Sequence, residues 1–107
     1  MRVAVISRDG VSVNERLHRA NDAFVWERDG AAVRFVSRRT LSSAPTKLFR
    51  DYLSLARVLS DCQWVVALGF NGEAKRELAA RGFRLHEARG AIEGVIRTLT
   101  PDSVLPA

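Results

Sequence analysis

One short segment combines a metal-ligating side chain with two cationic ones. His18 lies between Arg16 and Arg19. A neutral imidazole is a common metal ligand, and guanidinium groups form strong hydrogen bonds with carboxylates and similar anions. These residue types therefore predict a binding site for an anionic ligand at Arg16, His18 and Arg19, with His18 available to ligate a metal. The alternative interpretation is a solvent-exposed histidine that binds nothing.

A second candidate is the glycine-containing loop of residues 69–72. It follows a short apolar run, residues 63–68, and precedes a predicted helix for which Asn71 is a suitable cap. Backbone N–H groups at the start of a helix favour anions, and glycine permits close approach of a ligand. An ordinary strand-to-helix connection explains the loop equally well. We predict that the ligand is bordered by this loop and by the turn before the last helix, at Gly69, Asn71, Gly72 and Arg89.

The other reactive side chains favour structural roles. Cys62 precedes the apolar run, and free cysteine is among the most often buried residue types, so we expect it to be buried. His86, in a predicted strand, is expected to be a structural histidine. A single cysteine excludes a metal cage of several cysteines within one chain. The HExxH, CxxC and nucleophile-elbow patterns are absent, so we expect a protein that is not an enzyme.

The composition is typical of a globular domain. The chain has 107 residues, enough for one core, and 47% of them are hydrophobic. Its net charge of +5 arises from 17 basic and 12 acidic residues. The arginines are dispersed and no aromatic run accompanies them, which disfavours nucleic acid, although a diffuse positive field favours anions. No apolar run approaches the roughly 20 residues that span a bilayer, and no secretion signal is recognisable. We therefore expect a cytoplasmic protein without membrane contact.

Alternating strands and helices must position the candidate residues. Strands are predicted at residues 2–7, 23–28 and 31–37, with Asp29-Gly30 as the hairpin turn between the last two. In the third strand, one face is expected to carry Val33, Phe35 and Ser37. The spacing of apolar residues then predicts helices and strands in alternation: helix 46–60, strand 63–68, helix 72–81, strand 83–87 and a last helix from residue 92.

This order of elements predicts an α/β fold in a single domain, residues 1–107. The first three strands should be antiparallel neighbours, and helical crossovers should place the fourth and fifth parallel to the first. Right-handed crossovers favour the strand order 3-2-1-4-5 in a five-stranded mixed sheet with helices on both faces. This is the three-layer ribonuclease H-like arrangement. In it, the segment 11–21 and the loop 69–72 border one shallow site.

Several segments resemble a known protein family. Residues 1–10 (MRVAVISRDG), 59–72 (LSDCQWVVALGFNG) and 78–96 are similar, in order and spacing, to motifs of the NifX/NafY family, which also forms the C-terminal domain of NifB. The family's favoured cluster ligand is the histidine of an H-F-G segment. Arg16 occupies the matching position in this chain, and His18 follows two residues later.

The resemblance implies a role in the assembly of the dinitrogenase cofactor. It implies a non-enzymatic binding or carrier protein for the iron-molybdenum cofactor or an iron-sulfur precursor, with nitrogenase or cofactor-assembly proteins as partners. In this interpretation, Arg16 and Arg19 attract the anionic cluster and His18 ligates its iron. The alternative is a structural or regulatory protein-interaction module of the same fold that has lost the cluster site. We expect a monomer or a weak homodimer.

Overall fold

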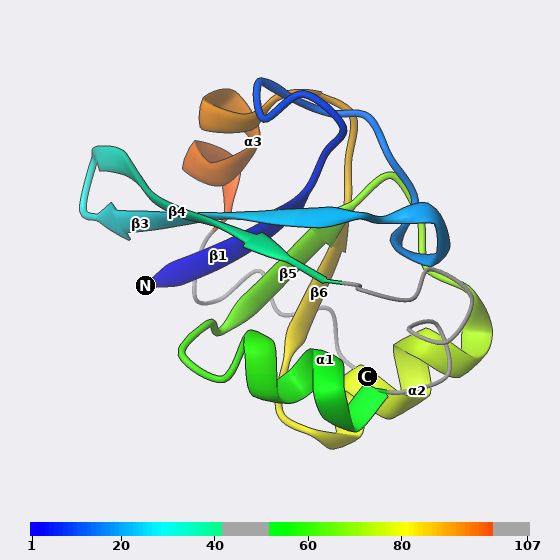
Figure 1. Ribbon diagram of the computed structural model, residues 1–107. Coiled ribbons are helices and arrows are strands. Elements are labelled where there is room, and N and C mark those ends of the chain that lie inside the picture. The colour runs from blue at the N-terminus through cyan, green and yellow to red at the C-terminus, as the bar shows by residue number, and fades with distance from the viewer. Residues whose placement is uncertain (42–51, 100–107) are drawn as a thin grey trace.

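The computed structural model describes residues 1–41 and 52–99 (Figure 1). Within these ranges the chain forms a large sheet, a small two-stranded sheet and three helices. The strands are β1 (Arg2–Ile6), β2 (Ser12–Val13), β3 (Asp22–Asp29), β4 (Ala32–Thr40), β5 (Trp64–Ala67), β6 (Arg84–Glu87) and β7 (Gly90–Ala91). The helices are α1 (Tyr52–Val58), α2 (Gly72–Ala80) and α3 (Ile92–Thr98), and a 3-10 turn spans Leu17–Arg19.

The strands of the large sheet lie in the order β4-β3-β1-β5-β6. β3 is antiparallel to both β1 and β4, whereas β5 is parallel to both β1 and β6. This is the mixed five-stranded sheet that the sequence predicts. Because β1, β5 and β6 are parallel, the segments that follow them emerge at the same edge of the sheet. The small sheet, in which β2 pairs with β7, joins two of these segments.

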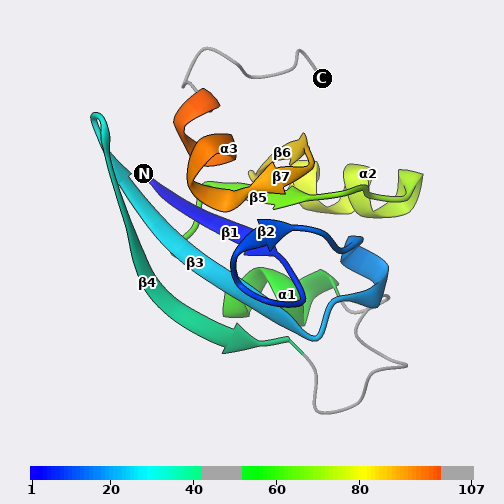
Figure 2. The same ribbon diagram turned by 90° about the horizontal axis from the view of Figure 1, so that it is seen from above.

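The sheet separates two hydrophobic clusters, with α1 and α2 on one face and α3 on the other in Figure 1, and Figure 2 shows α1 and α3 on opposite sides of the sheet. The central strands β1 and β5 contribute to both. Ala4 and Val65 belong to the cluster under α1 and α2, and Val3 and Trp64 belong to the cluster under α3. Burial on both faces explains the continuous apolar run in β5. None of the helices in the described ranges is long and apolar enough to cross a membrane.

β4 differs from its prediction in extent and in the faces of its residues. It continues beyond Ser37, and a register shift between Val25 and Trp26 interrupts its pairing with β3. Phe35 lies opposite Trp26, but Ser37 lies opposite Val25, on the other face of the sheet. The prediction that Ser37 shares a face with Val33 and Phe35 is therefore wrong. The extra residue of a β-bulge inverts the alternation of side chains.

Both ends of α2 follow local signals in the sequence. Asn71 precedes the helix, and its Oδ1 accepts a hydrogen bond from the N–H of Ala74 (2.7 Å). At the other end, Gly82 adopts a φ of +91°, and the N–H of Phe83 donates to the carbonyl of Leu78 (3.1 Å). This is the Schellman stop that glycine favours. The predicted cap and the predicted stop are both confirmed.

Two other predicted segments are only partly matched. The helix predicted at residues 46–60 is α1 in the described part of the chain, and residues 46–51 lie outside that part. The irregular segment after β1 contains β2 as well as the expected short helical turn. A strand of two residues shows no periodicity, so no pattern in the sequence could have indicated β2.

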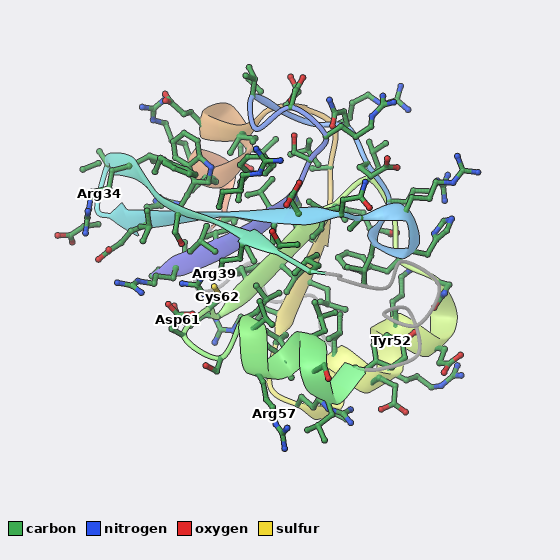
Figure 3. The ribbon with its side chains drawn as sticks, viewed as in Figure 1. Arg34, Arg39, Tyr52, Arg57, Asp61 and Cys62 are labelled. Carbon is green, nitrogen blue, oxygen red and sulfur yellow. The ribbon has the colours of Figure 1, made fainter. Side chains whose placement is uncertain are left out.

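An ion cluster joins β1, β4 and the segment before β5, and Figure 3 labels two of its members, Arg39 and Asp61. The carboxylate of Asp61 accepts hydrogen bonds from Arg39, one of them 2.8 Å long, and from Arg2. The bonds from Arg39, together with the weaker effect of Arg2, hold the pKa of Asp61 well below its ordinary value. Because the folded-state pKa is lowered, the stabilisation is present above the unfolded-state pKa of about 4 and is lost as the pH falls below it.

Asp61→Asn is expected to lower the free energy of unfolding by about 1 kcal/mol at neutral pH, a value that allows for the solvent exposure of the cluster. The difference from the wild type should shrink as the pH falls below about 4. Urea unfolding at neutral and acidic pH measures both effects. Asp29→Asn is the control, because it removes an exposed carboxylate and keeps a residue suited to the hairpin turn. A difference that does not change with pH would contradict the assignment.

Candidate functional site

The turn Leu17–Arg19 is held against the loop after β5 by backbone hydrogen bonds. The N–H of Leu17 donates to the carbonyl of Gly69 (3.2 Å), and the N–H of Leu68 donates to the carbonyl of Glu15 (3.0 Å). These bonds join the segment that follows β1 to the segment that follows β5. The predicted contact between the two segments is therefore confirmed.

A shallow pocket of about 410 Å³ lies along this contact. Arg16 and Arg19 are exposed and His18 is half-buried. Two guanidinium groups are thus accessible to an anion beside one imidazole. The structure brings these three predicted residues together, and the pocket is lined by Glu15, Arg16, His18, Arg19 and Leu68.

Gly69 allows charged side chains to approach the loop closely. A β-carbon at this position would lie 3.2 Å from Nη1 of Arg16 and 3.4 Å from Oε2 of Glu87. Gly69 is not among the glycines with a positive φ, so the backbone conformation does not require glycine here. A side chain at residue 69 would crowd these two charged groups, which would have to move by a few tenths of an ångström to make room for it.

Three charged residues at this site were missed by the sequence prediction. Glu87, at the end of β6, accepts a hydrogen bond from the N–H of Phe70 (3.0 Å) and pairs with Lys75 of α2 (3.4 Å). Glu15 lines the pocket itself. Glu87 reaches the site because it lies opposite Ala67, the last residue of the neighbouring parallel strand. This strand register would have identified Glu87, but it is known only once the two strands are paired.

The remaining predicted residues lie in different settings. Asn71 uses its side-chain oxygen to cap α2, and Gly72 is the exposed first residue of that helix. Arg89 lines a second pocket of about 410 Å³ beside α3. The chain turns immediately after Arg89, at Gly90 with a φ of +115°, and enters β7, which pairs with β2. The structure therefore does not bring Arg89 to the pocket of Arg16.

Neither Cys62 nor His86 lines the pocket. Cys62 precedes β5, at the opposite end of that strand from the pocket, and is 6% exposed. Its predicted burial is confirmed, and burial raises the pKa of its thiol to about 11. A thiol that stays protonated is a poor nucleophile and a poor metal ligand. His86 lies opposite Val66, which belongs to the cluster under α3.

The pocket is suited to binding an anion that brings most of its own metal ligands. In residues 1–41 and 52–99, no three His, Cys, Asp or Glu side chains gather as they would around a bare metal ion. His18 is the imidazole that lines the pocket. Positive charge near the pocket and its loop comes from Arg16, Arg19 and Lys75. The pocket offers one imidazole, the carboxylate of Glu15 and two guanidinium groups rather than a complete coordination shell.

The chain is similar to one described family and to several solved structures. The family model described as dinitrogenase iron-molybdenum cofactor matches residues 1–101. No curated protein shows significant sequence similarity to the chain.

Three solved structures have a similar fold. The protein PH0822 is 20% identical, with a TM-score of 0.69 over 91% of this chain and 87% of that chain. A candidate dinitrogenase from Methanocaldococcus jannaschii is 11% identical, with a TM-score of 0.59 over 91% and 85%. A candidate NifB protein from Thermotoga is 18% identical, with a TM-score of 0.51 over 95% and 98%. At these identities the structures bear on the fold alone, whereas the family match extends over nearly the whole sequence. The chain belongs to the dinitrogenase iron-molybdenum cofactor family.

Proposed function

We propose that this protein binds an anionic iron-sulfur or iron-molybdenum cluster of dinitrogenase, or a precursor of it, and carries it without chemical change. Family membership supports the class of ligand. The main structural support is the backbone hydrogen bond between Leu17 and Gly69. This bond holds Arg16, His18 and Arg19 beside the loop that follows β5. The two arginines attract the anion, and His18 supplies a ligand to iron.

The residues of the pocket suit a preassembled cluster. The sulfide ions of such a cluster already occupy most coordination positions of its iron atoms, so a carrier needs to supply few ligands. One imidazole meets this need, and guanidinium groups form charge-assisted hydrogen bonds with the carboxylates of an organic acid bound to the cluster. Few contacts in a shallow pocket give modest affinity, which suits a protein that must release its cargo.

The proposal also covers the setting in which the protein acts. The fold is of the ribonuclease H-like three-layer type, used here for binding rather than catalysis. The partners are nitrogenase or other cofactor-assembly proteins, which deliver or receive the cluster. The protein acts in the cytoplasm as a monomer or a weak homodimer.

Anaerobic reconstitution with isolated iron-molybdenum cofactor tests the proposal. The protein should retain the cofactor through gel filtration, and the visible and paramagnetic resonance spectra of the cofactor should change on binding. His18→Ala is expected to lower retention about tenfold or more, because it removes the imidazole from the pocket. His86→Ala, which removes a histidine outside the pocket, is the control. Unchanged spectra on mixing would count against the proposal.

A protein-interaction module without a cluster is the second candidate. β4 favours it, because within residues 1–41 and 52–99 this strand has a neighbour on one side only, and it carries Phe35, which is 49% exposed. Unpaired backbone groups at a sheet edge and an exposed aromatic side chain are typical of surfaces that bind another chain. This candidate predicts that the native protein retains no cluster but copurifies with a partner protein.

A further inference from the structure

A carboxylate of the protein itself lies among the anion-binding groups of the proposed site. Oε2 of Glu87 accepts a hydrogen bond from the N–H of Phe70 (3.0 Å), and Oε1 lies 3.4 Å from Nζ of Lys75. A backbone N–H just before α2 and an ammonium group are donors that an incoming anion would also use. Glu87 and Arg16 both lie close to Gly69. Glu87 therefore holds a position that a bound anion could take.

The contacts of Glu87 can be broken at low cost, provided that another acceptor replaces it. The side chains of Glu87 and Lys75 are 46% and 53% exposed, and ion pairs with this exposure contribute little to stability. Phe70, in contrast, is 8% exposed. Its hydrogen bond to Glu87 is partly buried, and an N–H group shielded from water that loses its acceptor costs free energy. An oxygen or sulfide of an anionic ligand can serve as the new acceptor, and then Glu87 can turn into solvent.

We infer that Glu87 is an internal counter-anion of the loop beside the pocket, at Gly69 and Phe70, which the anionic cluster or its organic acid displaces on binding. This inference rests on the proposed function and adds a means of regulating affinity. Without ligand, Glu87 satisfies the N–H of Phe70 and offsets the charge of Lys75. With ligand, an anionic group makes these contacts instead. The competition lowers affinity, which favours release of the cargo.

Glu87→Gln tests the inference, because glutamine keeps the length and an acceptor oxygen but removes the charge. Citrate is the probe, titrated into isotope-labelled protein and followed by the amide resonances. We expect Glu87→Gln to bind citrate about three- to tenfold more tightly than the wild type. The Phe70 amide of the wild type should shift as citrate is added. Glu93→Gln is the matched control, because it removes one carboxylate from a pair with Arg97 on α3 and should leave citrate affinity unchanged.

The outcomes separate this inference from the proposed function. If the wild type retains the iron-molybdenum cofactor but Glu87→Gln binds citrate no more tightly, the inference is overturned and the proposed function stands. Weaker citrate binding by Glu87→Gln, or no citrate binding by either protein, also overturns the inference. If Glu87→Gln binds citrate more tightly but neither protein retains the cofactor, displacement is supported and the cluster function is overturned.

Discussion

Replacement of Arg16 and Arg19 together by glutamate is expected to weaken cluster binding by about two orders of magnitude. Both side chains line the pocket and are exposed. An exposed cation about 5 Å from an anion contributes just under 1 kcal/mol, and reversal of its charge changes the interaction by about twice that amount. After screening by salt, two reversals against a multiply charged ligand sum to about 2 to 3 kcal/mol. Equilibrium dialysis with isolated iron-molybdenum cofactor, followed by molybdenum analysis, measures the loss.

A second pair of arginines provides the control for net charge. Arg57→Glu with Arg97→Glu makes the same change in total charge, but on α1, where Figure 3 labels Arg57, and on α3. Neither residue lines the pocket. This control should keep most of the affinity, and the effect of the pocket variant should shrink at high salt. Equal losses in the two double variants would show that total charge, not the pocket, governs binding.

Leu78→Ala is expected to cause the largest loss of stability, about 3 kcal/mol in the free energy of unfolding. Leu78 is fully buried in the cluster between the sheet and the helices α1 and α2. Truncation removes its contacts and leaves a cavity that the surrounding side chains cannot fill. For a domain of this size, the midpoint of thermal unfolding should fall by roughly 12 to 20 °C. Circular dichroism during heating, with urea unfolding as a second measure, checks this value.

Leu53→Ala is the matched control for the same chemical change. Leu53 lies on α1 and is 51% exposed, so truncation removes much less buried surface. The expected loss is within about 0.5 kcal/mol, as for most surface substitutions. Losses of similar size at Leu53 and Leu78 would contradict the position of α2 on the sheet, and with it the placement of Lys75 and the loop before it.

Local patterns in the sequence were sufficient to predict the elements that position the site. The apolar run of β5 predicts burial on both faces because a central strand contacts a helix layer on each side. Asn71 and Gly82 predict the ends of α2, since a cap and a left-handed turn depend on residues within one helical turn. Arg16, His18 and Arg19 meet at one pocket partly because they are neighbours in the chain.

Contacts between distant residues were decided by the tertiary structure alone. In the sequence, Glu87 and Arg89 lie two residues apart, and the prediction named Arg89 and missed Glu87. Glu87 reaches the loop because β6 pairs in register with β5, whereas Arg89 does not because the chain turns at Gly90 toward β7. The same holds for Ser37, which a β-bulge moves to the other face. Strand register and bulges result from pairing between segments far apart in the chain, so no local pattern specifies them.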